Sequence, residues 1–146
     1  MTHDPAPVRH HREEYDQGLR NPTEDIFGVD RPWGEFRQFV SNETVTVKII
    51  TVQPGHRLSL QRHDHRGEMW HVLDVPIDVQ VDDATWQATV GETVWVPRGA
   101  VHRMGNSGTA PGRLLEVGFG FFDEADIERF EDDYARHDED DEPAED

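Results

Sequence analysis

The sequence of 146 residues contains no cysteine, a single lysine (Lys48) and no apolar run long enough to cross a membrane. Without cysteine, the chain can form neither a disulfide nor a thiolate metal site. The first residues, Met1-Thr2-His3-Asp4-Pro5, lack the apolar stretch of a signal peptide. We therefore expect a soluble, cytoplasmic protein without a membrane partner, and the length suits one domain with a single core.

The formal net charge of −17 is concentrated at the C-terminal end. Residues 123–146 hold 14 of the 31 acidic side chains and only two basic ones, Arg129 and Arg136. Residues 137–146 are almost entirely acidic, and we expect them to form a disordered tail. An acidic chain is repelled by phosphate backbones, which argues against a nucleic-acid partner.

The middle of the chain is rich in short β-branched segments separated by turn residues. The run Thr44–Val52 ends at Pro54-Gly55, which is typical of a strand followed by a turn. Many short strands with regular turns indicate an antiparallel barrel or jelly roll. The strand candidates are residues 35–40, 44–52, 57–61, 68–73, 77–81, 85–89, 93–96 and 113–122.

Two segments outside the strand-rich region are expected to differ from it. Residues 1–30 are polar and without periodicity, so they are interpreted as an N-terminal arm that precedes a barrel over residues 31–122. Residues 123–136 are predicted to form a C-terminal helix, because Ile127, Phe130 and Tyr134 recur at helical spacing. Asp123 would be its N-cap.

Metal-ligand residue types occur in two separate segments. The first is His63-Asp64-His65 followed by Glu68, and side chains alternate along a strand, so His63 and His65 should project to one side. The second contains His102 after a Pro97-Arg98-Gly99 turn. A lone histidine is more often an ordinary polar residue, but the combination predicts one divalent metal bound by His63, His65, Glu68 and His102. Zinc is the favoured ion, with Mn, Fe, Co or Ni as alternatives.

The two segments resemble the paired motifs of the cupin superfamily, which consists of small β-barrels that hold a metal inside. The second motif fits at each marked position, whereas the first has seven residues rather than five between Gly55 and His63. Further residues are similar to the type II phosphomannose isomerase domain: Arg31-Pro32-Trp33-Gly34, Leu58-Ser59-Leu60-Gln61, His65-Arg66, His102-Arg103, Glu116-Val117, Asp126-Ile127 and Arg129-Phe130-Glu131-Asp132-Asp133-Tyr134. The resemblance implies an all-β fold, a single cupin jelly-roll barrel with a short C-terminal helix.

The resemblance also implies interconversion of mannose 6-phosphate and fructose 6-phosphate through an enediol-type proton transfer. A base that is not a metal ligand must move the proton, and Glu116 and Lys48 are the candidates. A pairing of Glu116 with an arginine and a solvent-facing Lys48 are the structural alternatives.

The phosphate of such a substrate needs cationic partners. Residues in family-like motifs are the candidates for substrate binding, either through the phosphate or through hydroxyl groups: Ser59, Gln61, Arg66, Arg103 and Arg129. For the arginines, ordinary surface ion pairs are the alternative.

Two positions depart from the family pattern. Met69 stands where the family usually has histidine, and Gly118 stands where it usually has glutamine. These departures keep open a cupin that binds a sugar or sugar phosphate without turnover. An iron-dependent cupin dioxygenase is a further alternative, because histidines and a glutamate also suit that chemistry. Cupin-like barrels often pair through exposed sheet faces, so the resemblance also implies a homodimer.

Overall fold

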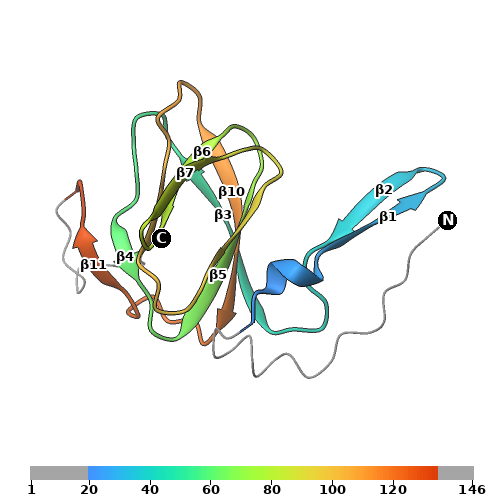
Figure 1. Cartoon of the computed structure of the whole chain (residues 1–146), viewed down its shortest axis with the longest axis horizontal. Coiled ribbons are helices and arrows are strands. Elements are labelled where there is room, and N and C mark those ends of the chain that lie inside the picture. Colours follow the sequence, from blue (N-terminus) through green and yellow to red (C-terminus); the bar gives the residue numbers. More distant parts are fainter. Residues whose placement is uncertain (1–19, 135–146) are drawn as a thin grey trace.

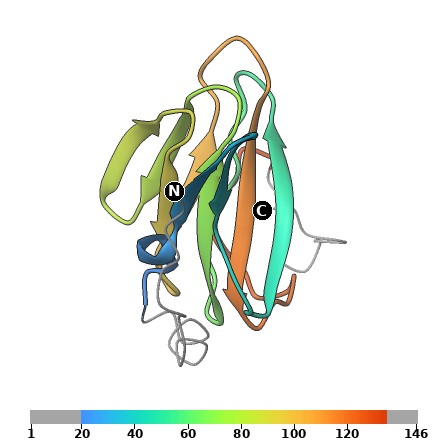
Figure 2. The same cartoon turned by 90° about the vertical axis from the view of Figure 1, so that its right-hand side faces the viewer.

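The computed structural model describes residues 20–134, which form two facing antiparallel sheets and a separate hairpin (Figures 1 and 2). One sheet has the strand order β3-β10-β5-β8 and the other β11-β4-β9-β6-β7. The elements in chain order are the 3-10 helix η1 (Pro22–Asp25), β1 (Phe27–Arg31), β2 (Gly34–Gln38), β3 (Val45–Val52), β4 (Leu60–Arg62), β5 (Arg66–Val72), β6 (Ile77–Val81), β7 (Ala84–Ala88), β8 (Thr93–Val96), β9 (His102–Gly105), β10 (Gly112–Gly120) and β11 (Glu128–Glu131).

The predicted all-β class and jelly-roll architecture are confirmed. Strand alternation places one side chain inside the barrel and the next outside, and the inner positions of both sheets form the main core. Trp70, Val72 and Leu114 of the first sheet pack in one cluster with Ile77 and Met104 of the second. Within residues 20–134, no helix is long and apolar enough to cross a membrane.

The prediction of a helix at residues 123–136 is wrong for the residues that the structure describes. Asp123 caps only a turn, through bonds from the Ala125 and Asp126 amides, and β11 follows as a strand that pairs with β4. Helical spacing of a few apolar residues was outweighed by the ladder to β4, a long-range contact that local propensity does not encode. Residues 135 and 136, like the predicted acidic tail at 137–146, lie outside the described residues.

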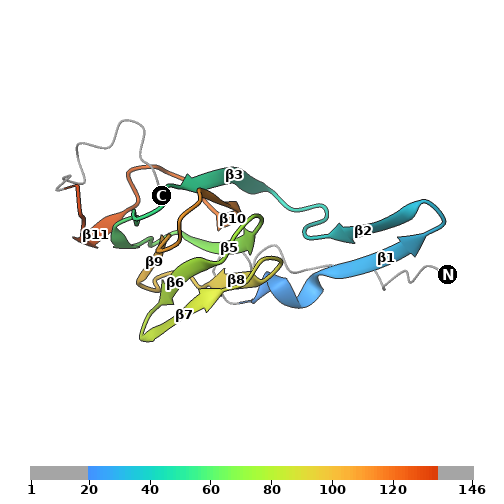
Figure 3. The same ribbon diagram turned by 90° about the horizontal axis from the view of Figure 1, so that it is seen from above.

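The arm and the barrel meet later in the chain than the sequence predicts. Strands β1 and β2 form their own two-stranded sheet, which projects to one side of the barrel, and the first barrel strand is β3 (Figures 1 and 3). Residues 1–19 of the predicted arm are outside the described part. Strand β9, which carries His102, was absent from the predicted strands.

A second apolar cluster lies on the outer face of the β3-β10-β5-β8 sheet. Met69, Val117 and Phe119 are buried there, and Ile26 and Phe39 on either side of the hairpin pack against them. The segments that flank the hairpin therefore cover part of the outer face of the β3-β10-β5-β8 sheet.

Candidate metal centre

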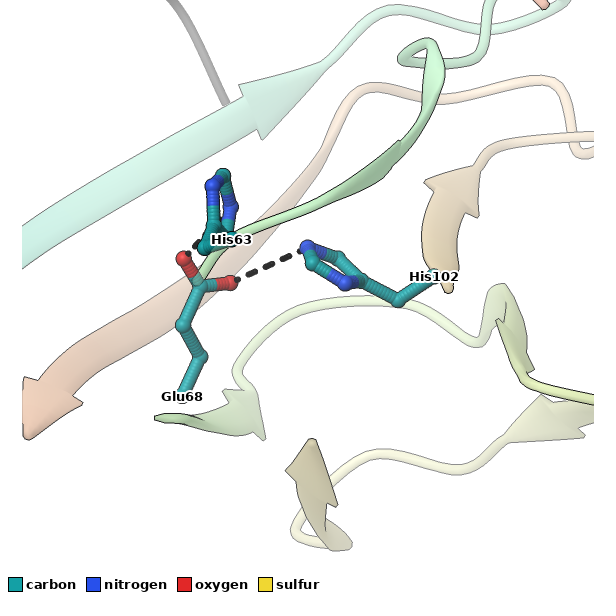
Figure 4. Close-up of side chains that lie close together, drawn as sticks. All are labelled: His63, Glu68 and His102. Atoms are coloured by element: carbon teal, nitrogen blue, oxygen red, sulfur yellow. Dashed lines mark ion pairs between the residues drawn. The ribbon is translucent and has the colours of Figure 1, made fainter. Parts of the chain in front are cut away.

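Three buried side chains converge between the two sheets: His63, Glu68 and His102 (Figure 4). The Nε2 atom of His63 lies 3.2 Å from one carboxylate oxygen of Glu68, and Nε2 of His102 lies 3.6 Å from the other. One ligand atom from each residue fits within 4.8 Å of the others. Two imidazole nitrogens and a carboxylate are a donor set that zinc and other divalent transition metals accept.

Different elements bring these ligands together. His63 follows the short strand β4, Glu68 lies within β5, and His102 is the first residue of β9. The turn at Gly99, which has a positive φ of 85°, connects two of them, because its amide donates to the His63 carbonyl over 3.0 Å. The turn at Gly99 therefore holds the backbone of His63 in place and also leads the chain into β9, where His102 is the first residue.

Backbone carbonyls orient both imidazole rings. His63 Nδ1 lies 2.7 Å from the Asp126 carbonyl oxygen, and His102 Nδ1 lies 2.9 Å from that of Ala100. A carbonyl only accepts, so each Nδ1 carries the proton and each Nε2 points at Glu68. This is the arrangement in which a hydrogen bond at one ring nitrogen selects the tautomer that binds metal through the other.

Glu68 is held as a carboxylate. Burial alone would raise the pKa of Glu68, but its surroundings of His63, His102 and the Arg66 guanidinium hold that pKa well below its usual range. The Trp70 indole also donates to Glu68 Oε1 over 3.1 Å. Trp70 follows Glu68 by two residues in β5, so both side chains project from the same strand face. This spacing is the sequence signal from which the Trp70–Glu68 contact could have been predicted.

The prediction that His63 and His65 share one strand face is wrong. Residues 63–65 form a bend between β4 and β5 rather than an extended segment, so the alternation of side chains doesn't apply. His65 is exposed and lies outside the cluster, while its backbone amide and that of Asp64 donate to the Asp126 carboxylate over 2.9 and 2.8 Å. The structure therefore brings together three of the four predicted ligands.

Both candidates for proton transfer share the inner sheet face with the cluster. Glu116 pairs directly with Lys48 across β10 and β3 and with Trp70 across β10 and β5, and cross-strand partners project to the same side. Glu116 is buried and lines a small cavity together with Gln61, Glu68 and His102. The Lys48 ammonium lies 3.6 Å from a Glu124 carboxylate oxygen, so Lys48 is not a purely solvent-facing residue.

Of the predicted substrate-binding residues, Gln61 lies beside the cluster and lines the small cavity. Gln61 lies opposite His102 in β9 and opposite Arg129 in β11, so these three form a row on the inner face. Ser59 is buried beside them and accepts a hydrogen bond from Gln61 over 3.1 Å. The other Gln61 amide atom, Oε1, is buried and accepts no hydrogen bond from the residues that the structure describes.

Arg66 and Arg103 have different surroundings. Arg66 is buried within the cluster and donates to Glu68 over 3.1 Å. Arg103 donates to the Leu58 carbonyl and to the Glu131 carboxylate, and it borders a larger groove of about 640 Å³ that contains none of the three clustered ligands. Arg103 also lines the small cavity that Gln61, Glu68, His102 and Glu116 line.

Comparisons with known proteins agree with this architecture. The family model described as "Mannose-6-phosphate isomerase C-terminal" matches residues 20–132. The chain belongs to this family. It is 40% identical to the alginate biosynthesis protein AlgA of Pseudomonas aeruginosa over 130 residues and 39% identical to the mannose-1-phosphate guanylyltransferase ManC of Salmonella typhimurium over 109 residues.

These relatives are much longer proteins. The match with AlgA covers 88% of this chain but 27% of AlgA, and the match with ManC covers 74% and 23%. Among solved structures, a cupin 2 domain-containing protein from Halorhodospira halophila aligns with a TM-score of 0.53 at 22% identity, covering 58% of this chain and 57% of that one. That likeness supports the cupin fold alone.

The two departures from the family pattern occupy opposite faces of the sheet. Met69 follows Glu68 in β5 and lies in the outer apolar cluster, so the missing histidine doesn't alter the inner face. Gly118 lies opposite Glu68 on β10, and a Cβ at this position would be 3.6 Å from the Arg66 side chain. Of the two, only Gly118 shapes the space around the cluster.

Asp126 holds the segment 63–65 in place, because its carbonyl bonds to the His63 ring and its carboxylate accepts from the Asp64 and His65 amides. This role was not predicted from the sequence.

We expect Asp126→Ala to lower the free energy of unfolding by about 1–3 kcal/mol, because two backbone amides lose a carboxylate acceptor. Metal affinity should fall by about 10- to 100-fold, as for other partners that orient a ligand. Urea unfolding and calorimetric metal titration measure the two effects. Asp64→Ala is the control, since the Asp64 side chain is 68% exposed, and equal losses in both variants would contradict the assignment.

Proposed function

We propose that this chain is a metal-dependent isomerase that interconverts mannose 6-phosphate and fructose 6-phosphate. The observation that carries the proposal is the convergence of His63, Glu68 and His102, with both imidazoles anchored through Nδ1. The family to which the chain belongs supports the substrate class, and the inner face adds a buried carboxylate and cationic side chains beside the cluster.

The three clustered side chains would hold one divalent ion, which when bound polarises the carbonyl and hydroxyl oxygens of the sugar. Glu116 is proposed to take the proton from one carbon and return it to the neighbouring carbon. It suits this role because it lines the same cavity as Glu68 and His102 but is not one of the clustered ligands. Lys48, the cross-strand partner of Glu116, would stabilise its carboxylate form and is the second candidate for proton transfer.

Arg103 and Gln61 line the cavity beside the cluster, and the cations Arg66 and Lys48 contact residues of the same inner sheet face. Arg66, Arg129 and Lys48 are proposed to bind the phosphate, and Gln61 with Ser59 to bind sugar hydroxyls. Arg103 is a further candidate for the phosphate, because it lines the cavity and its Nη2 is buried without a hydrogen-bond partner among the described residues.

The cavity beside the cluster has essentially no room for a water-sized molecule, whereas ligand pockets usually measure about 300–1,000 Å³. Substrate entry therefore requires side chains at its edge to move. Phe122 is proposed to be one of the side chains that move, since its ring contacts both the Arg66 guanidinium (4.1 Å) and the Lys48 ammonium (4.5 Å).

A coupled assay for fructose 6-phosphate formation from mannose 6-phosphate, run with Zn, Mn, Fe, Co or Ni, tests the proposal. We expect turnover that disappears after chelation and returns with metal. Binding of mannose 6-phosphate without turnover for any metal would contradict it and support a non-catalytic sugar-phosphate-binding cupin. Oxygen consumption with bound iron would support the dioxygenase instead.

We further propose that two copies associate through the outer face of β3. Val47 and Ile49 are 55% and 57% exposed on this edge strand, and the projecting hairpin carries Trp33 (73% exposed) and Phe36. A two-stranded hairpin alone is marginally stable in water, so packing of each hairpin on the other copy's apolar stripe would support both.

Val47→Asp with Ile49→Asp should convert a dimer to a monomer, as measured by sedimentation velocity. Both side chains are more than half exposed, so the fold should tolerate the changes, and circular dichroism checks this. A monomeric wild-type protein, or a dimer that persists in the double variant, would contradict this interface.

A further inference from the structure

Arg66 binds two of the atoms that a metal ion would need. Its guanidinium is buried, with Nε 3.1 Å from Glu68 Oε2 and Nη2 3.1 Å from His63 Nε2. An arginine side chain has donors only, so His63 Nε2 accepts from Arg66 with its lone pair. The proton of the His63 ring lies on Nδ1, which donates to the Asp126 carbonyl. The ring is then neutral, and Nε2 can act as an acceptor for Arg66.

A neutral imidazole nitrogen has one lone pair in the plane of the ring. It can accept a hydrogen bond from Arg66 or bind a metal ion, but it cannot do both. Glu68 is less restricted, because each carboxylate oxygen has two lone pairs. The conflict between Arg66 and a bound metal is therefore located at His63 Nε2.

The Arg66 guanidinium has other contacts that would still hold it if it moved away from His63. The Phe122 ring lies under Arg66 at 4.1 Å, and Nη1 donates to the Asp123 carbonyl over 3.4 Å. The same ring is 4.5 Å from the Lys48 ammonium, so two cations adjoin one aromatic side chain. An anionic group that enters at Phe122 would meet both positive charges.

Resting on the proposed metal-dependent function, we propose that Arg66 is an internal cation that competes with the metal at His63. In the structure, the guanidinium neutralises Glu68 and occupies the His63 lone pair. Metal loading displaces it from His63 and makes its donors available to the phosphate of the substrate. Metal and sugar phosphate would then bind cooperatively, and linkage requires each to strengthen the other by the same factor.

Isothermal titration calorimetry with Mn²⁺ on the full chain tests the competition. We expect Arg66→Gln to bind Mn²⁺ about 5- to 150-fold more tightly than the wild type, the usual range of coupling between sites. Arg66→Lys retains the positive charge but has no planar fork to bridge Glu68 and His63, so its affinity should be intermediate. Circular dichroism and urea unfolding check the fold of both variants.

A second measurement needs no variant. Sorbitol 6-phosphate has no carbonyl group and can't be isomerised, so its affinity for the wild-type protein can be titrated with and without Mn²⁺. We expect tighter binding with Mn²⁺, and no such gain in Arg66→Gln.

Three results would overturn the proposal in different ways. Equal or weaker Mn²⁺ binding by folded Arg66→Gln would show that Arg66 does not compete with the ion. Equal affinity of the wild type for sorbitol 6-phosphate with and without Mn²⁺ would exclude the coupling. Failure of the wild type to bind any divalent metal would overturn the proposed metal site together with this inference, whereas the first two results would leave that site intact.

Discussion

His102→Ala is expected to abolish stoichiometric binding of divalent metal, while His65→Ala leaves it unchanged. His102 supplies one of the two imidazole nitrogens directed at Glu68, whereas His65 is exposed and outside the cluster. Loss of a partner that only orients a ligand already costs about 10- to 100-fold in affinity, so loss of a ligand should exceed 100-fold. Elemental analysis after dialysis and calorimetric titration measure this difference, and isomerase turnover should fall with metal content.

The two variants distinguish the structure from the sequence pattern. The pattern predicts both His65 and His102 as metal ligands, whereas the structural cluster contains only His102. Because His102 is buried and its Nδ1 bonds to Ala100, the alanine variant also requires a check of its unfolding free energy. His102→Gln leaves a smaller cavity and provides a second test. Undiminished metal content in both His102 variants, or loss of metal in His65→Ala, would contradict the three-residue site.

Glu116→Gln is expected to lower kcat by about 10²- to 10⁴-fold without loss of metal, the range for removal of a general acid–base group. The amide keeps the volume of the carboxylate but cannot accept a proton from carbon. Glu116 is not among the clustered ligands, so metal content should be unchanged. The coupled assay gives kcat and KM, and exchange of the substrate C2 proton with solvent isolates the proton transfer itself.

Glu35→Gln is a matched control, since Glu35 is an exposed residue of the hairpin. This variant should retain full turnover. If Glu116→Gln keeps wild-type kcat and wild-type proton exchange, Glu116 is not the base, and Lys48→Met becomes the next variant to assay.

The sequence predicts the barrel well because strand alternation and turn residues are local signals. The boundaries expected for β6 and β8 agree with the structure residue for residue. The C-terminal strand could not be predicted in the same way, because it depends on contacts between distant segments. Pairing of Arg129 with Gln61 is one example, and it replaced the expected helix by β11.

The candidate site shows the same limit. Spacing alone places His63 and His65 on one face, but only if the backbone between them is extended. Asp126, more than 60 residues away in the chain, receives the Asp64 and His65 amides and accompanies a bend at that point. No local pattern in the sequence specifies this contact, so the bend that separates His65 from the other predicted ligands could not be predicted.

The alternation of side chains along a strand also explains why the two departures from the family pattern, Met69 and Gly118, have different structural consequences. Met69 is next to a predicted ligand in the sequence but packs on the opposite face, with Val117 and Phe119. Its effect should therefore be on packing against the arm rather than on substrate geometry. Gly118 is the one of the two departures that lies on the inner face, opposite Glu68.

A crystal structure of the metal-loaded full chain, with anomalous diffraction data at the absorption edge of the ion, tests the central claim most directly. We predict one ion bound by Nε2 of His63, Nε2 of His102 and the Glu68 carboxylate, with His65 outside its coordination shell. An ion that is bound by His65, or that lies away from Glu68, would contradict the account.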